Sequence, residues 1–271
     1  MKYKITPSNP IGIFDSGIGG LTVARSVFKE LPNENIIYLG DNARLPYGTK
    51  SKETVILYSI ECLKFLLQKK VKLIVIACNT SSAISLNFLR KITKIPVIGV
   101  IEPGSRGAVQ KSKNHQIGVI GTQATINSKA YQNNIKKLDT KAGIYAKNCS
   151  LFVQLAEDGW TDTRIAQMIA REYLQDFKNT NIDTIIMGCT HYPLLKETIQ
   201  SSVGKNINLI DPGEETAKDV RRTLEEMDLL NRSKKKGYHK FFVTDFPINF
   251  KKISERFLGK RIKEIKKVKL N

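Results

Sequence analysis

Two short apolar segments of this 271-residue chain each end in a cysteine that is followed by a polar, threonine-bearing turn. They are residues 73–80 (LIVIACNT) and residues 184–191 (TIIMGCTH). The neutral and charged forms of a thiol lie close in energy near neutral pH, so a cysteine can act as an acid or as a base. Two thiols that face one cleft could add and remove a proton on opposite faces of one carbon.

A second pair of segments indicates that the chain contains an internal duplication. Residues 11–16 (IGIFDS) resemble residues 117–122 (IGVIGT), an offset of 106 residues, and Cys78 and Cys189 are offset by 111 residues. Two matches at nearly the same offset predict a repeat about the size of one small domain. Chance similarity between buried strands is the alternative, but a polar residue or cysteine ends each run at the same place, which favours duplication.

Strand-like and helix-like segments alternate along the chain, and the apolar runs lack polar alternation. This pattern predicts parallel strands covered by helices on both faces, hence an α/β fold with doubly wound sheets. The last helix, the last strand and the basic tail have no counterpart in the second copy, so we expect domains of residues 1–101 plus 213–271 and of residues 102–212. The expected strands are 11–15, 36–39, 73–77, 96–100, 117–120, 183–187 and 241–244; the expected helices are 19–30, 51–69, 81–91, 125–137, 162–178, 193–202 and one opening at Asp211.

The composition is that of a soluble globular protein, with 41% hydrophobic and 25% charged residues. No apolar run approaches the length that crosses a bilayer, so we expect no membrane contact. Residues 1–7 lack the apolar core of a signal peptide, and we therefore expect a cytoplasmic protein.

The formal charge of +19 is uneven, because residues 232–271 hold 14 Lys and Arg against 3 Asp and Glu. Such a tail suggests a nucleic-acid or topoisomerase partner. The alternative, which we favour, is a solvated basic surface, because Ile and Phe residues interrupt the lysine runs as in an amphipathic element.

Polar residues collect where the predicted parallel strands end, and ligands of open α/β sheets bind at that edge. A cysteine before a helix N-terminus is expected to have a lowered pKa. Asn and Thr side chains there can hydrogen-bond a carboxylate, and His191 could tune the nearby thiol. Asp15 could hold an ammonium group or simply cap a helix. The residues at this edge are Asp15, Ser16, Asp41, Cys78, Asn79, Thr80, Thr122, Cys189, Thr190 and His191.

Two other interpretations are disfavoured by spacing. The glycine-rich residues 15–22 (DSGIGGLT) have Thr22 where a dinucleotide-binding loop needs its third glycine, and they lack a P-loop lysine. We interpret them as a tight turn that brings backbone close to a small anionic ligand. A zinc site would have to draw on Cys78, Cys149, Cys189 and His191, yet the chain has no C-x-x-C pair, so we expect no metal.

Six stretches between residues 11 and 220 closely resemble, in order, those of glutamate racemases in the aspartate/glutamate racemase superfamily. The last 50 residues match only weakly, and the chain departs from the family pattern at Asn42, where a threonine is usual, and at Ser150 and near Gln154, where prolines are expected. The matching stretches are 14–21 (FDSGIGGL), 40–48 (GDNARLPYG), 77–80 (ACNT), 118–122 (GVIGT), 188–195 (GCTHYPLL) and 211–217 (DPGEETA).

The resemblance implies two pseudo-symmetric α/β domains with the active site in the cleft between them, and a homodimer is expected. It implies interconversion of L- and D-glutamate without a cofactor, supplying D-glutamate for peptidoglycan. Cys78 is expected to act on the D-enantiomer and Cys189 on the L-enantiomer, and aspartate remains the alternative substrate. The implied helpers of the cysteines are Asp15, His191 and Glu157; the implied substrate-binding residues are Asp15, Ser16, Tyr47, Gly48, Asn79, Thr80, Thr122, Thr190 and His191.

Overall fold

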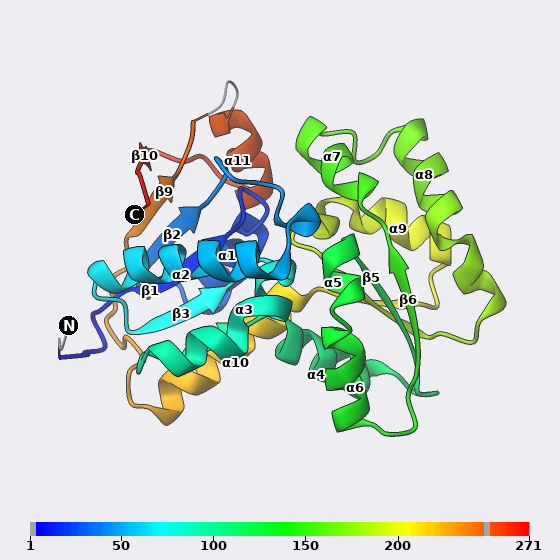
Figure 1. Cartoon of the computed structure of the whole chain (residues 1–271), viewed down its shortest axis with the longest axis horizontal. Helices are drawn as coiled ribbons and strands as arrows, with labels where there is room; N and C mark the ends of the chain where they lie inside the picture. The colour runs from blue at the N-terminus through cyan, green and yellow to red at the C-terminus, as the bar shows by residue number, and fades with distance from the viewer. Residues whose placement is uncertain (1–3, 247–249, 271) are drawn as a thin grey trace.

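A computed structural model describes residues 4–246 and 250–270 and has two parallel β-sheets flanked by helices (Figure 1). The first sheet has the order β10-β9-β2-β1-β3-β4 and the second has the order β6-β5-β7-β8. The first is built from β1 (Ile11–Asp15), β2 (Ile36–Gly40), β3 (Leu73–Ile76), β4 (Val97–Gly99), β9 (His239–Val243) and β10 (Ile265–Lys267). The second is built from β5 (Gln116–Gly121), β6 (Gly143–Asn148), β7 (Thr184–Gly188) and β8 (Asn208–Ile210).

The strand order confirms the predicted duplication. The order β2-β1-β3-β4 in the first sheet repeats as β6-β5-β7-β8 in the second. In register, Ile11 of β1 lies opposite Leu73 of β3, and Ile117 of β5 lies opposite Thr184 of β7. The strands that lead into the two cysteines, β3 and β7, therefore hold equivalent positions in the two sheets.

Helices cover both faces of the first sheet, as its uninterrupted apolar strands predict. Ile13 of β1 packs in one cluster with Val27, whereas the next residue, Phe14, packs in another cluster with Leu66. The helices are α1 (Leu21–Glu30), α2 (Lys52–Gln68), α3 (Asn79–Ile92), α4 (Ile101–Lys111), α5 (Gln123–Asn127), α6 (Ala130–Leu138), α7 (Leu151–Asp158), α8 (Arg164–Leu174), α9 (Lys196–Val203), α10 (Pro212–Glu226) and α11 (Phe250–Leu258).

Three predicted helices differ from the structure. The single helix expected over 125–137 is wrong, because Lys129 adopts a left-handed conformation with φ of 54° that separates α5 from α6. The helix expected over 162–178 ends at Leu174 and continues as a 3₁₀ helix over Gln175–Asn179. The helix expected over 193–202 begins with a 3₁₀ turn over Tyr192–Leu195 before α9 starts.

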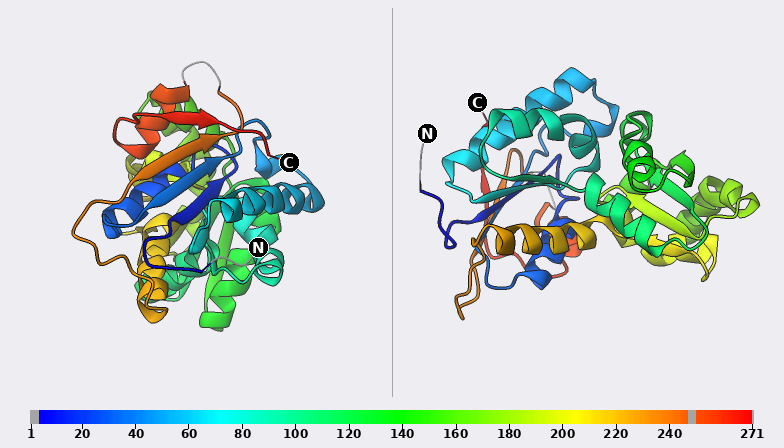
Figure 2. Two further views of the ribbon diagram at one scale, coloured as in Figure 1. Left: turned by 90° about the vertical axis from the view of Figure 1, so that its left-hand side faces the viewer. Right: turned by 90° about the horizontal axis from the view of Figure 1, so that it is seen from below.

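The basic tail is part of the first sheet. Strand β9 pairs with β2, and β10 pairs with β9, so residues distant in sequence lie side by side (Figure 2, left). Phe241 and Phe257 of this tail are buried. Helix α10, which follows the second sheet, packs against both α1 and α4. The exact domain boundaries stay a prediction, as does contact of the tail with nucleic acid or a topoisomerase. No helix within the described ranges is long and apolar enough to span a bilayer.

Candidate functional site

A cavity of about 280 Å³ lies where strands of both sheets end, and both halves of the duplication line it. Cys78, which follows β3, and Cys189, which follows β7, both contribute to its wall. The size lies near the lower limit of ordinary ligand sites and suits a small metabolite better than a nucleotide. The lining residues are Ser16, Pro46, Tyr47, Gly48, Thr49, Cys78, Asn79, Thr80, Thr122, Thr125, Ser150, Leu151, Val153, Gln154, Gly188, Cys189, Thr190 and His191.

Cys78 is the N-cap residue of α3, and its Sγ accepts a hydrogen bond of 3.4 Å from the backbone N–H of Ser81. The lowered pKa expected from this position is wrong. Burial raises the pKa of the Cys78 thiol to about 12, and the charge of Asp15 adds to the rise. The hydrogen bonds from Ser16 and Ser81 act in the opposite direction but do not outweigh burial. At pH 7 Cys78 is therefore a neutral thiol.

Asp15 ends β1 and is fully buried beside the Cys78 side of the site. Its Oδ2 accepts a 3.0 Å hydrogen bond from the N–H of Gly17, whereas its Oδ1 has no partner among the described residues. Burial raises the pKa of Asp15, and the positive charge of His191 opposes the rise. A buried carboxylate oxygen without a partner can still accept a hydrogen bond or a proton.

The glycine-rich loop after β1 brings the two halves into direct contact. A Cβ added to Gly19 would lie 2.3 Å from Oγ1 of Thr190, and one added to Gly20 would lie 2.4 Å from Cβ of Asp15. The hydroxyl of Thr22 donates a 2.8 Å hydrogen bond to the carbonyl of Thr190. The loop is therefore the tight, closely packed turn that its sequence predicts.

His191 connects Cys189 to an acidic residue. Its Nδ1 lies 3.7 Å from Sγ of Cys189, and its Nε2 lies 3.0 Å from Oε1 of Glu157. Burial opposes the charged ring, but the hydrogen bonds with Cys189 and Glu157 outweigh it and raise the pKa of His191 to about 10. The imidazolium therefore persists at neutral pH beside the Cys189 sulfur. Unlike Cys78, Cys189 does not precede an α-helix, because a 3₁₀ helix begins at Tyr192.

Hydroxyl and amide groups form the polar wall of the cavity. The hydroxyls of Thr80, Thr122 and Thr125 lie within 3.0–3.1 Å of one another. The hydroxyl of Tyr131 donates a 2.6 Å hydrogen bond to Oδ1 of Asn79, which leaves the amide nitrogen of Asn79 as the donor for a ligand. Such a cluster can bind a carboxylate through several hydrogen bonds.

Tyr47 and Gly48 lie in a 3₁₀ helix (η1, Tyr47–Thr49) that closes one side of the cavity. Tyr47 is buried, and its hydroxyl donates to Oδ2 of Asp41. A Cβ on Gly48 would lie 3.1 Å from Cβ of Thr122, so the backbone of the first half approaches the second half closely here.

The structure brings ten of the predicted site residues onto one cavity wall, while Asp15 and Glu157 lie just behind it. Their functional roles stay predictions. Sequence reasoning missed Thr125, Leu151, Val153 and the buried donor Tyr131, for which the sequence carries no clear signal. Ser150 and Gln154, noticed only as departures from the family pattern, also line the cavity. In the ranges 4–246 and 250–270, no three or more His, Cys, Asp or Glu side chains are grouped to hold a metal ion.

The chain is similar over most of its length to proteins of one family. The family model for Asp/Glu/Hydantoin racemase matches residues 12–220. The chain is 47% identical to a glutamate racemase of Geobacter metallireducens over 264 residues, 97% of this chain and 98% of that protein. It is 48% identical to a glutamate racemase of a Sulfurihydrogenibium species over 254 residues, 92% and 94% of the two chains. A crystal structure of glutamate racemase from Francisella tularensis in complex with D-glutamate matches with a TM-score of 0.92 at 42% identity, covering 98% of this chain and 99% of that one.

Proposed function

The chain belongs to the Asp/Glu/Hydantoin racemase family, an assignment that makes it an isomerase, and we propose that it interconverts L-glutamate and D-glutamate. The observation that carries this proposal is the pair of thiols, Cys78 and Cys189, on one small cavity, each following an equivalent strand of the duplicated fold. The proposal for glutamate also rests on the relatives at 47% and 48% identity, which are named glutamate racemases.

In the proposed mechanism, one thiolate removes the α-proton from one face of the substrate while the thiol on the other face donates a proton. For L-glutamate the proposed base is Cys189, whose Sγ lies 3.7 Å from Nδ1 of the His191 imidazolium. The acid is Cys78, whose pKa of about 12 keeps it protonated.

The reverse reaction requires Cys78 to become the base. Burial is the main cause of its raised pKa, and a substrate ammonium group bound near the thiol would favour the thiolate. We propose that Asp15, through the oxygen that lacks a partner in the described residues, holds that ammonium or accepts the proton of Cys78. Asp15 would thus assist Cys78 as the pair of His191 and Glu157 assists Cys189.

The carbanion that forms when the α-proton leaves must be stabilised by groups next to the carboxylate. We propose that the amide of Asn79 and the hydroxyls of Thr80, Thr122 and Thr190 donate hydrogen bonds to the substrate carboxylate. Donors fixed in advance stabilise developing charge without having to reorganise during the step. In this scheme the two thiols carry the proton transfers, and the reaction uses no cofactor.

The biological setting is also a proposal. D-glutamate made by this reaction would serve peptidoglycan synthesis, and with it the cell wall and cell shape, in the cytoplasm. We expect the protein to act as a homodimer.

The substrate proposal is tested by following exchange of the α-proton in deuterated water, with no cofactor added. D- and L-glutamate are compared with D- and L-aspartate at equal concentration. Exchange with inversion on glutamate alone is the expected result. Exchange on aspartate alone would replace the proposed substrate with the shorter amino acid, and exchange on neither would refute the racemase proposal.

A further inference from the structure

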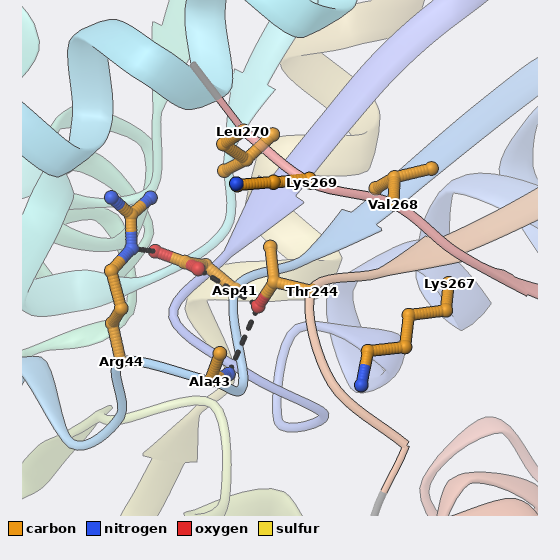
Figure 3. Close-up of a pocket in the computed structure, with 8 residues that line it drawn as sticks. All are labelled: Asp41, Ala43, Arg44, Thr244, Lys267, Val268, Lys269 and Leu270. Atoms are coloured by element: carbon orange, nitrogen blue, oxygen red, sulfur yellow. Dashed lines mark hydrogen bonds and ion pairs between the residues drawn. The ribbon is translucent and has the colours of Figure 1, made fainter.

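A second pocket, of about 400 Å³, lies at the carboxyl ends of β2, β9 and β10 in the first sheet (Figure 3). None of its lining residues lines the cavity that holds the cysteines. This edge of a parallel sheet is where α/β proteins bind ligands. The lining residues are Asp41, Ala43, Arg44, Thr244, Lys267, Val268, Lys269 and Leu270.

The lining of the pocket has three basic residues and one acidic residue, Asp41. Arg44 is held by two carboxylates, because it pairs with Asp41 and also with Glu61, which lies outside the lining. Oδ2 of Asp41 accepts hydrogen bonds from Nε of Arg44 at 2.7 Å and from the hydroxyl of Tyr47. Its Oδ1 accepts a 2.9 Å hydrogen bond from the hydroxyl of Thr244. Lys267 and Lys269 then contribute two further positive charges to the wall.

Part of this positive charge has no anion beside it. Lys269 forms no ion pair with any residue of the described chain, and Figure 3 shows its side chain extending toward Arg44 and Asp41. Lys267 pairs with Asp245 at 2.7 Å, but both side chains are exposed, so water competes with this contact. Nη2 of Arg44 is shielded from water and lacks a hydrogen-bond partner among the described residues. An unpaired buried donor is destabilising, and an anionic oxygen would relieve it.

We propose that this pocket binds a small polyanion, a molecule with two or more phosphate or carboxylate groups. Its oxygens would contact Lys269, Lys267 and, after a small rotation of the side chain, Nη2 of Arg44. The apolar side chains of Val268 and Leu270 would pack against the rest of the ligand.

The hydrogen bonds of Asp41 also link this pocket to the cavity that holds the cysteines. The functional link described next rests on the proposed glutamate reaction. Asp41 bonds Arg44 on the pocket side and Tyr47 on the cavity side through the same oxygen. A polyanion that draws Arg44 away from Asp41 would alter the position of Tyr47 and thereby change the KM for glutamate. Because coupling between two sites is reciprocal, glutamate would change the affinity for the polyanion by the same factor.

Binding is tested by calorimetry on the full chain at roughly physiological salt, with inorganic pyrophosphate and citrate titrated separately. We expect a Kd below about 1 mM for at least one of them, and the pair distinguishes phosphate from carboxylate ligands. The variant K267M/K269M should bind roughly tenfold more weakly or worse. The control K263M/K266M removes the same charge from residues that do not line the pocket and should bind as the unmodified protein does.

Three results would overturn binding at this pocket: no binding of either probe, equal loss in the control variant, or competition by glutamate that abolishes binding outright. The coupling is tested independently by the effect of a bound probe on the KM for glutamate. Y47F, which removes the hydrogen bond to Asp41, should keep the binding and lose that effect. A probe that binds without moving the KM of the unmodified protein would refute the coupling while leaving the glutamate reaction unaffected.

Discussion

Replacing Glu157 with glutamine removes the charge that the structure places against Nε2 of His191 at 3.0 Å. A hydrogen bond to a charged group contributes about 1.5–3 kcal/mol, and because the Glu157 side chain is 24% exposed we take the lower value. At 1.36 kcal/mol for each tenfold change, the pKa of His191 should fall by about one from its value of about 10. His191 would then lose its proton at lower pH.

The sign of the effect follows from which form of His191 is active. In the proposed mechanism the active form of His191 is the imidazolium beside the Cys189 sulfur, so activity is kept below the pKa of His191 and is lost as the pH rises through it. In E157Q the alkaline limb of kcat/KM should move down by about one pH unit. At pH 7 the loss should be small, and at pH 10 it should be about fivefold relative to the unmodified enzyme.

The assay is circular dichroism of glutamate, recorded from each enantiomer between pH 6 and 10.5. Since the two enantiomers have equal free energy in solution, kcat/KM must fall by the same factor in both directions. The matched control is D162N, which removes an equal charge from an exposed residue of the same region. An alkaline limb that does not move in E157Q, or that moves equally in D162N, would refute the role given to Glu157.

Three further changes test other parts of the structure. Y131F removes the 2.6 Å hydrogen bond to Oδ1 of Asn79, so the KM for glutamate should rise roughly tenfold. The free energy of unfolding in urea should fall by about 1–3 kcal/mol, and an unchanged KM would contradict this prediction. K72M removes the cation that pairs with buried Glu34 at 2.6 Å and leaves the 2.7 Å hydrogen bond from the N–H of Asn231. The free energy of unfolding in urea should therefore fall by about 3–5 kcal/mol, part of which K72M/E34Q recovers. Burial raises the pKa of Asp211 from 3.8 to about 6. The protonated side chain therefore stabilises the fold fully below pH 3.8, and this stabilisation is lost as the pH rises through about 6. D211N keeps an N-cap, so its stability relative to the unmodified protein should rise by about 1.4 kcal/mol between pH 5 and pH 8; a parallel pH profile would contradict this.

The central strands and the residues that end them were predictable because their burial leaves a strong pattern. Continuous apolar runs form the central strands β1, β3, β5 and β7. Because the polar residues that follow these strands are equivalent in the two halves, the sequence alone predicted both the duplication and the cysteine pair. By contrast, β6 is an edge strand with partly exposed residues (GIYAKN), so its sequence resembles a loop. The break at Lys129 was equally hidden, since a left-handed lysine has no sequence signature of its own.

Tertiary contacts account for the parts of the site that sequence reasoning missed or judged wrongly. Thr125 lies in the short helix α5, and its place on the cavity wall depends on contacts of its hydroxyl with Thr80 and Thr122. The sequence correctly predicted that Cys78 precedes a helix. The burial that dominates the pKa of Cys78 depends on tertiary packing, which the sequence does not show. The hydrogen bond of Glu157 to His191 joins residues 34 positions apart and can be found only in the structure.

The most direct test of the two-thiol mechanism is racemisation of D- and L-glutamate in deuterated water by C78A and C189A, beside the unmodified protein and the buried-cysteine control C62A. We predict that each active-site variant loses racemisation in both directions, because one face of the α-carbon then lacks its thiol and either direction needs a thiol on both faces, and that C62A retains it. Full turnover by C78A or by C189A would contradict the mechanism.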